Sequence, residues 1–370
     1  MTNKNVELPN LPKMMRALVL TSPGEFEVKD IPVPLPGEGE VLCKIRAVAI
    51  CGSDPEIIRG DLAGTWPPTY PFTPGHEWAG EVVEVGAGVH GFAVGDRVAG
   101  EAHKGCGFCR NCLQGRYTIC LNYGINEVGH RHYGFTSPGA YAQYNTYSIK
   151  SIKKLPPQVS FREGALVDTG GVTLHGMELS GITPGGTVAV IGPGPIGIIA
   201  MRYAKILGAA KVIMIGRGDR LVAAKKFGAD ETINFEMEDP VGAVKSFTSG
   251  FGVDQAIECS GAPGTFNQAV RMVAKGGSVI LMGVPSDRVM ESLPFKHIVH
   301  DEIAIYGSRA NPNVSWKILE CLASGKLQVA DLITHVFSLE DFSIGLDTFV
   351  NRKDGVIKVV IEPNGPDSIQ

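Results

Sequence analysis

Four of the eight cysteines lie close together in the stretch GCGFCRNCLQGRYTIC, residues 105–120. Cys106, Cys109, Cys112 and Cys120 follow the pattern C-x2-C-x2-C-x7-C, which suits disulfides, a redox couple or a metal site. Tetrahedral zinc needs four soft ligands on short turning loops, and this spacing supplies them. An iron–sulfur cluster usually continues with a cysteine three residues on, followed by proline. We therefore expect a structural zinc ion, since four thiolates leave no open position for substrate.

A second group of metal-ligand residues precedes this loop. Cys51 follows the strand-like run VLCKIRAVAI, and His76 and Glu77 lie in a Pro/Gly turn before the alternating run GEVVEVG. Taken singly, a cysteine after a strand is usually a core residue, and a histidine in a turn is usually surface. Together a thiolate, an imidazole and a carboxylate suit a catalytic zinc ion. The sequence thus predicts a second metal centre, at the ends of strands.

The composition limits the class of protein. At 370 residues, with 44% hydrophobic and 19% charged residues, the chain fits two globular domains. Its net charge of −4 argues against nucleic-acid or anionic-membrane partners. No apolar run approaches the ~20 residues of a membrane span. The polar start MTNKNVELPNLPKMM is expected to be a frayed tail without an export signal. We expect a cytoplasmic protein with reduced thiols, which disfavours disulfides.

The run GGTVAVIGPGPIGIIAMRYAKILGA is typical of a dinucleotide-binding unit. An apolar strand leads into Gly192, Gly194 and Gly197, and an apolar-periodic helix follows. These glycines, with Pro195 and Ile196, let a pyrophosphate approach the helix N-terminus. Further strand-like runs at KVIMIG, VDQAIECSG, GGSVILMG and DEIAIYGS complete an expected doubly wound parallel sheet.

The order of the motifs resembles a known family. CGSD, GHEWAG, VGDRV, the four-cysteine loop, GAYAQY, EGALVDTGG, VIGPGPIG and GGSVILMG span roughly residues 15–362. In this order they resemble the zinc-dependent medium-chain alcohol/polyol dehydrogenases, which include sorbitol, threonine and sugar dehydrogenases. The resemblance implies an α/β fold with a GroES-like, mainly β catalytic domain, residues 1–167 and 308–370. A Rossmann coenzyme domain would occupy residues 168–307.

The resemblance also implies roles for the site residues. Cys51 and His76 would bind the catalytic zinc, and Glu77 would be a ligand or would transiently displace water. A further ligand position holds Asp168, and the acidic residue there resembles polyol, sugar and amino-alcohol enzymes. With the cysteine loop, this gives two zinc ions per subunit.

The expected chemistry is hydride transfer from a zinc-bound alkoxide to a nicotinamide cofactor. Ser53, two residues after Cys51, is expected to take the alcohol proton, although it could be a mere turn hydroxyl. Many family members carry a histidine three residues later, where this chain has Glu56. The outer end of the relay is therefore open between Glu56 and water.

The second strand of the coenzyme domain bears on the cofactor. NAD enzymes usually end it with an acidic residue, but here Ile215 and Gly216 precede Arg217. This resembles NADP-dependent secondary-alcohol relatives in part, and Arg220 could help to bind a 2′-phosphate. We favour NADP. In the alternative, Arg217 is a solvated residue, Asp219 reaches the ribose and the cofactor is NAD.

Two further residues are substrate candidates. Arg309 stands where polyol relatives keep an arginine, and His130 lies in the loop GHRHYGFTSPGAYAQY. Arg309 could instead bind a cofactor phosphate or form a surface salt bridge, and His130 could simply be a loop residue. The expected activity is oxidation of a secondary hydroxyl of a polyol or sugar-like substrate, against a simple secondary-alcohol or threonine-like activity. A nucleic-acid-binding zinc ribbon and a non-catalytic dinucleotide-binding protein are rivals from other classes. The resemblance favours a homotetramer over a dimer, with DEIAIYG as the pairing edge.

Overall fold

The computed structural model describes residues 11–285 and 290–366, which divide into two compact units. The first comprises the residues up to Asp168, Ser315–Ala323 and those from Ile333 on, and the second comprises Thr169–Val314 and Ser324–Leu332. The first ten residues of the expected polar tail and the last four of the chain lie outside the described part.

The expected boundary at 307/308 differs from this division, because 308–314 and 324–332 group with the second unit. Their contacts explain the grouping. Arg202 binds both carboxylate oxygens of Asp331 and the carbonyl of Gln328, and a Cβ on Gly171 would lie 2.6 Å from that of Asn311. These tertiary contacts join segments distant in sequence, so no local pattern marks them.

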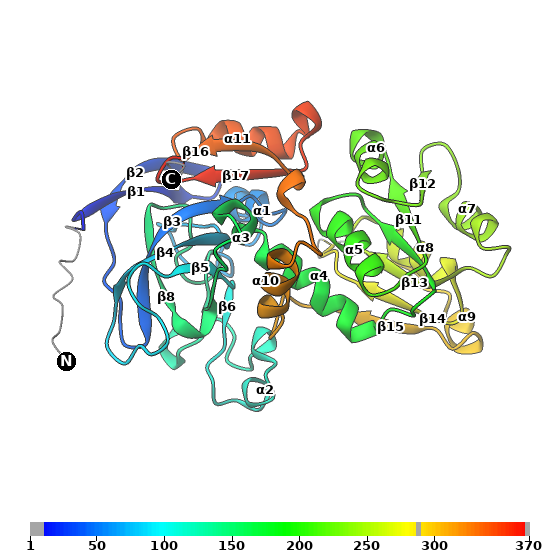
Figure 1. The fold of residues 1–370 in the computed structure, drawn as a ribbon, viewed down its shortest axis with the longest axis horizontal. Coiled ribbons are helices and arrows are strands. Elements are labelled where there is room, and N and C mark those ends of the chain that lie inside the picture. The colour runs from blue at the N-terminus through cyan, green and yellow to red at the C-terminus, as the bar shows by residue number, and fades with distance from the viewer. Residues whose placement is uncertain (1–10, 286–289, 367–370) are drawn as a thin grey trace. The chain divides into compact units, whose positions relative to one another are not determined.

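The first unit is built on a mainly antiparallel sheet of seven strands (Figure 1). Their order is β16 (Ile333–Ser338), β17 (Lys358–Glu362), β3 (Glu40–Ala49), β4 (Glu77–Val85), β5 (Arg97–Gly100) and β9 (Ile152–Lys154), with β8 (Tyr144–Ser148) also paired to β3. Two separate pairs join β1 (Met14–Ser22) to β2 (Glu25–Pro32) and β6 (His103–Lys104) to β7 (Arg131–His132). Strands made late in the chain therefore lie beside strands made early.

Short helices connect these strands. They are α1 (Asp54–Arg59), α2 (Arg110–Leu113), α3 (Phe161–Ala165), α10 (Ser315–Ala323) and α11 (Phe342–Val350), with 3-10 turns η1 (Tyr117–Ile119), η2 (Asn126–Val128), η3 (Ile149–Ser151) and η5 (Lys353–Gly355). Ser160 caps α3 in a capping box with Glu163, which fixes the chain direction just before Asp168.

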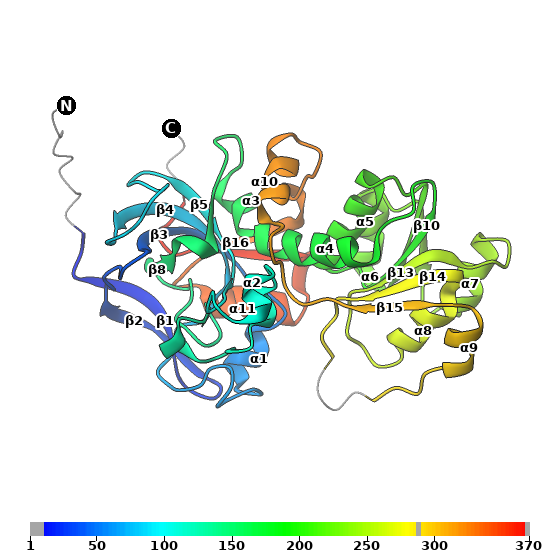
Figure 2. The same cartoon turned by 90° about the horizontal axis from the view of Figure 1, so that it is seen from below.

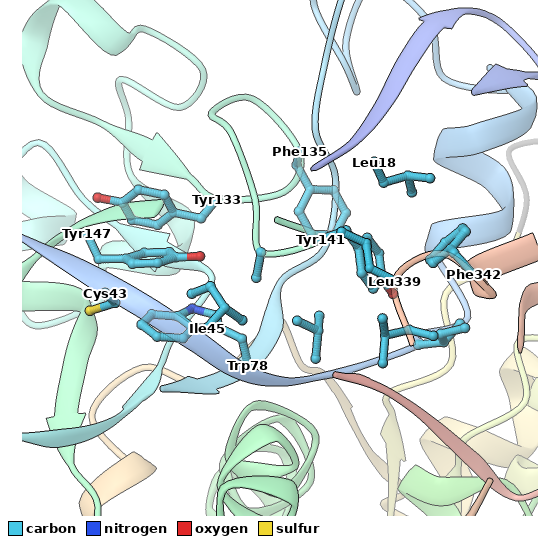
Figure 3. Close-up of a cluster of buried hydrophobic side chains, with 14 of the residues drawn as sticks. Leu18, Cys43, Ile45, Trp78, Tyr133, Phe135, Tyr141, Tyr147, Leu339 and Phe342 are labelled. Carbon is cyan, nitrogen blue, oxygen red and sulfur yellow. The ribbon is translucent and has the colours of Figure 1, made fainter. Parts of the chain in front are cut away.

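Aromatic and aliphatic side chains from several strands fill the core of the first unit (Figure 3). Trp78 on β4 stacks on Tyr147 of β8 with ring centroids 3.9 Å apart. A Cβ on Gly100 would lie 2.0 Å from the Trp78 indole nitrogen, so β5 needs glycine there. This packing holds β3 and β4 rigidly, and the candidate metal ligands lie at the ends of these two strands.

The second unit has a parallel six-stranded sheet with helices on both faces (Figure 2). The strand order is β12 (Glu231–Asn234), β11 (Lys211–Gly216), β10 (Thr187–Ile191), β13 (Val253–Glu258), β14 (Val273–Leu281) and β15 (Ala304–Gly307). The helices are α4 (Val167–Ser180), which starts in the first unit, α5 (Pro195–Ile206), α6 (Gly218–Lys226), α7 (Pro240–Phe247), α8 (Thr265–Met272) and α9 (Phe295–His300), with the 3-10 turn η4 (Ala330–Leu332).

The strand order reverses at β10, which is where doubly wound sheets bind dinucleotides. The five strands named from sequence are present, whereas the short strand β12 has no strong apolar run and the sequence reading missed it. Within the described residues, no helix is long and apolar enough to cross a membrane.

Candidate active site

Cys51, His76 and Glu77 lie together in the first unit. Each offers one ligand atom, and these atoms lie within 4.8 Å of one another. Cys51 follows β3, while His76 immediately precedes β4 and Glu77 is its first residue, not a turn residue as expected. The register explains the convergence, because Ala49 at the end of β3 pairs directly with Glu77.

Asp54 orients this group from the N-terminus of α1. Its Oδ2 accepts hydrogen bonds from the Cys51 N–H at 2.8 Å and from the Tyr141 hydroxyl at 2.7 Å. Its Oδ1 lies 3.8 Å from His76 Nδ1. Asp54 is fully buried, and this burial raises the pKa of its carboxyl against the opposing effect of His76. A carboxylate behind Nδ1 leaves Nε2 as the nitrogen for a metal.

Glu77 forms an ion pair with Lys358 of β17, with Oε2 2.5 Å from Nζ. Both side chains are buried. Burial alone would lower the pKa of Lys358, but Glu77 and Cys51 overcome it and hold the pKa above its usual value. The lysine thus stays charged beside the candidate metal ligands.

Asp168 lies in the first turn of α4, and its Oδ1 accepts the N–H of Ala102 at 3.3 Å. Burial raises the pKa of Asp168 to about 6, with His76 opposing the shift and Glu77 adding to it. Asp168 is therefore within electrostatic range of the group, although it is outside the set of three converging ligand atoms.

These charges fit a divalent cation. Burial would lower the pKa of His76, yet the negative charges of Cys51, Asp54 and Glu77 raise it to about 10. A buried imidazole that attracts a proton so strongly lies in a region of excess negative charge. Thiolate, imidazole and carboxylate donors converging there are the set that zinc prefers.

Ser53 and Glu56 follow Cys51 closely. Ser53 occupies the N-cap of α1, yet its hydroxyl makes no capping bond to the helix. Its Oγ is buried and has no hydrogen-bond partner among the described residues. Glu56 lies half-buried on α1. Their roles in proton transfer remain predictions.

The cysteine loop also converges on one point. Cys106, Cys109, Cys112 and Cys120 have sulfur atoms within 4.8 Å of one another, and the 106–112 and 109–120 pairs are 3.9 Å apart. A zinc tetrathiolate with Zn–S bonds of about 2.3 Å has edges of about 3.8 Å, so the fit is close. All eight cysteines are free thiols.

Backbone donors favour the thiolate form of Cys106 and Cys109, whereas burial raises the pKa of Cys112 and Cys120. Burial acts to raise the pKa of Cys106, but N–H groups of Phe108 and Cys109 and the Asn122 side chain bring it down to about 6. Asn122 Nδ2 donates to Cys106 Sγ at 3.3 Å. A thiol that ionises readily is a good metal ligand.

The start of α5 in the second unit fits a pyrophosphate. Gly192 has φ +101°, and a Cβ on Gly197 would lie 1.9 Å from the Gly192 carbonyl oxygen. Gly194 is the N-cap, without a side-chain cap, and a Cβ there would meet open space. Pro195, which has no N–H, and Ile196 open the first turn, so the backbone N–H groups available to an anion begin at Ile196.

Arg217 follows β11 and is the N-cap residue of α6. Its guanidinium is half-exposed and lies 2.6 Å from Glu236. Arg220 lies in the first turn of α6, half-buried. Arg217 thus lies just after the end of β11, beside the glycine turn, and its role in cofactor binding stays a prediction.

The two substrate candidates differ in exposure. Arg309 is exposed, in the segment after β15, in the second unit. His130 is fully buried in the first unit, where Nδ1 accepts the Gly124 N–H at 3.2 Å and the ring lies 4.7 Å from that of Tyr123. Substrate contact by either residue stays a prediction.

Sequence reasoning missed Asp54, Lys358 and Glu101, which are three buried charged residues around the site. Asp54 had a local signal, because it belongs to the quoted motif CGSD. Lys358 and Glu101 had none, since their position depends on strand pairing between distant segments.

Two family models match the chain. The alcohol dehydrogenase GroES-like domain covers residues 37–157, and the zinc-binding dehydrogenase model covers residues 195–324. The two units with their ligand groups thus define a zinc-type oxidoreductase.

Individual relatives agree. A sorbitol dehydrogenase of Bacillus subtilis is 35% identical over 96% of this chain and 99% of its own. An L-threonine 3-dehydrogenase of Pseudoalteromonas atlantica is 33% identical over 89% of this chain and 94% of its own. The solved structure of a putative zinc-binding dehydrogenase from Sinorhizobium meliloti, bound to NADP, has a TM-score of 0.87 at 31% identity, covering 95% of this chain and 100% of that one.

The chain belongs to the zinc-type medium-chain alcohol dehydrogenase family. The expected fold, a GroES-like domain with a Rossmann domain, is confirmed.

Proposed function

We propose that the chain oxidises a secondary hydroxyl of a polyol or sugar-like substrate with NADP. The observation that carries the proposal is the convergence of Cys51, His76 and Glu77 next to Ser53. Ser53 follows Cys51 by two residues, and its buried hydroxyl has no hydrogen-bond partner in the described structure. Zinc at such a site polarises an alcohol oxygen and makes its proton acidic. The names of the sorbitol and threonine dehydrogenase relatives support a hydroxyl-bearing substrate.

Each of the site residues has a distinct role in this proposal. Cys51, His76 and Asp168 would hold the catalytic metal, and Glu77, which pairs with Lys358, would be a further ligand or would transiently displace water there. Asp54 fixes the His76 ring. Ser53 accepts the alcohol proton and passes it to Glu56 or to water. Arg309 and His130 bind the substrate. Cys106, Cys109, Cys112 and Cys120 hold a second, structural zinc.

The acidic residue at position 168 favours a polyhydroxylated substrate over a simple alcohol. A carboxylate ligand makes the centre harder than a second thiolate would and suits oxygen donors. The threonine dehydrogenase relative supports a second candidate, an amino alcohol. We further propose a homotetramer, dimerised through the exposed edge strand β15, in the cytoplasm.

Initial rates of NAD(P)H formation test the proposal. Each oxidised cofactor is combined with a panel of polyols, amino alcohols and simple secondary alcohols. Saturable turnover of a polyol with NADP supports it, and turnover confined to an amino alcohol supports the second candidate. Turnover with none of them, by protein containing two zinc ions per chain, contradicts it.

Arg217 and Glu236 give a matched pair for the cofactor. Arg217→Ala removes the guanidinium that would bind a 2′-phosphate and is expected to lower kcat/KM for NADP at least about tenfold, with little effect on NAD. Glu236→Gln removes the charge that pairs with the same guanidinium and is expected to raise kcat/KM for NADP. If both variants leave the NADP/NAD ratio unchanged, Arg217 does not select the cofactor.

A further inference from the structure

A buried carboxylate, Glu101, lies between the cysteine loop and the candidate metal centre within the first unit. It follows β5 and is fully buried. Its Oε2 accepts the Tyr117 hydroxyl at 2.7 Å. Tyr117 begins the 3-10 turn η1, between the thiols of Cys112 and Cys120. One side chain of the loop thus reaches the segment that leads to the site.

The residue after Glu101 touches the site. The Ala102 N–H donates to Asp168 Oδ1 at 3.3 Å, and its carbonyl accepts the Tyr133 N–H at 2.8 Å. The Glu101 N–H in turn donates to the Ser151 carbonyl at 2.7 Å. Because Glu101 and Ala102 are consecutive, a movement of the Glu101 side chain that shifts its backbone also shifts the donor on Asp168.

Tyr117 packs close to one of the four cysteines of the loop, Cys112. A Cβ built on Gly105 would lie 2.4 Å from Cys112 Sγ and 2.8 Å from the Cβ of Tyr117, so these three groups are in close contact. A metal held by Cys112 and its three partners would therefore hold Tyr117 in place. Without that metal the loop has few buried side chains to maintain the contact.

The hydrogen bond from Tyr117 is the strongest interaction that the structure gives the Glu101 side chain. Its other oxygen lies 3.6 Å from Lys153 Nζ, beyond ordinary hydrogen-bond length, and Lys153 is about a third exposed. A buried carboxylate that loses its donor is destabilised strongly. Loss of the Tyr117 hydroxyl would therefore draw Glu101 toward Lys153.

We propose that Tyr117 and Glu101 are positioning residues through which metal occupancy of the cysteine loop sets the position of Asp168. Through them the structural site supports the second metal centre as well as its own loop. This inference rests on the proposed function in one respect, namely that Cys51, His76 and Asp168 bind a metal.

Cobalt substitution of the full chain tests the inference without substrate. Tyr117→Phe keeps all four thiols and removes only the hydroxyl. It is expected to bind two Co²⁺ per chain, to change the visible absorption of the cobalt at the Cys51–His76 centre, and to release that ion to a chelator about tenfold faster, as loss of an outer-shell partner does. Tyr133→Phe is the matched control, since it loses a buried hydroxyl that accepts the Ser148 N–H at 3.0 Å. It is expected to behave as wild type.

Two Glu101 variants approach the pair from the other side, leaving the cysteine loop untouched. Glu101→Gln keeps an acceptor for Tyr117 and is expected to match wild type in spectrum and release rate. Glu101→Leu removes the acceptor and is expected to match Tyr117→Phe. This pair keeps the inference testable if Tyr117→Phe fails to load its cysteine loop.

The outcomes separate the two hypotheses. If wild type binds two Co²⁺ and Tyr117→Phe and Glu101→Leu share its spectrum and release rates, the inference is wrong while the metal centre stands. If wild type binds only one Co²⁺, the proposed catalytic centre fails and the inference fails with it.

Discussion

Ser53 occupies the N-cap position of α1 without making the usual capping hydrogen bond. A serine at a helix N-cap normally accepts a backbone N–H, and loss of that bond costs about 1 kcal/mol. Here the hydroxyl is buried and makes no such bond to α1. The hydroxyl therefore does not stabilise the helix by capping, and it is free for the proposed contact with a bound alcohol.

Ser53→Ala is expected to lower kcat about 10²-fold or more, because the alcohol proton loses its first acceptor. Metal content and the unfolding temperature should stay at wild-type values, since the helix loses no cap. Steady-state kinetics with metal analysis measures both. Ser53→Thr keeps a hydroxyl and should restore most of the rate. Equal kcat for alanine and wild type would exclude the proton role.

Lys358 is a fully buried cation paired with a fully buried carboxylate. Lys358→Met keeps the length and removes the charge, which leaves Glu77 unpaired. The free energy of unfolding of the metal-free protein is expected to fall by about 3–5 kcal/mol. Urea denaturation measures the change.

Lys154→Met is the matched control for this prediction. Lys154 also pairs with a carboxylate, Asp96 at 2.9 Å, but its side chain is 57% exposed. An exposed pair contributes about 0–1 kcal/mol, so this variant should be nearly neutral. Similar unfolding midpoints for the two variants would show that the buried pair has no special weight.

At the scale of elements, α5 shows how two glycines of one motif differ. Gly197 is needed by the fold itself, since its Cβ would collide with the Gly192 carbonyl. Gly194 has φ −82°, which alanine adopts readily, and its Cβ would enter open space. The space in front of Gly194 is where a pyrophosphate would approach the helix.

Gly194→Ala is therefore expected to fold normally and to bind NADP at least about tenfold more weakly, or about 1.4 kcal/mol. Cofactor titration by fluorescence, with thermal unfolding beside it, measures the two effects. Gly197→Ala should lose stability as well as binding. If Gly194→Ala binds NADP as wild type does, the cofactor does not use this turn.

The short helix α2 buries little apolar surface. Its four residues are exposed or half-buried, with Leu113 among them 73% exposed, and Phe108 just before the helix is 60% exposed. An element with so little buried apolar surface has no core of its own. The proposed structural metal, bound by the four thiolates, would hold it.

Metal removal by a chelator should therefore open this loop first. Trypsin is expected to cut after Arg110 or Arg116 in the metal-free protein, while both stay protected in the metal-bound form. Mass spectrometry of the fragments gives the cleavage sites. A first cut elsewhere in the chain would show that the loop is stable without metal.

At the scale of the molecule, each unit has its own hydrophobic core. One is centred on residues such as Trp78 and Tyr141, and the other on residues such as Ile213 and Val279. Two cores of this kind allow two unfolding transitions. Calorimetry is expected to show two transitions. NADP at a hundredfold excess over Kd should raise the free energy of unfolding of the second unit by about 2.7 kcal/mol, and chelation should lower the unfolding temperature of the first. A single transition that responds to both ligands would contradict this division.

What the sequence predicted is what depends on short-range spacing. The four cysteines, the glycine turn and five of the six strands of the second unit each lie within one short stretch, so their residue types are enough to identify them. His76 and Glu77 were also found, although Glu77 lies in β4 and not in a turn.

What the sequence did not predict depends on pairing between distant segments. Lys358 meets Glu77 only because β17 pairs with β3, which pairs with β4. Arg202 holds residues 328 and 331 across 126 and 129 positions, which moves that segment to the second unit. No single stretch carries this information.

The sheet of the first unit has a consequence for synthesis of the chain. Strand β17 lies directly against β3, although the whole of Thr169–Val314 is translated between them. As the ribosome proceeds, the main segment of the second unit emerges as one continuous stretch and can fold early. The sheet of the first unit cannot be completed until β17 emerges. Until β17 emerges, the carboxylate of Glu77 lacks Lys358. The buried ion pair beside the candidate metal ligands therefore forms only after β17 has been synthesised.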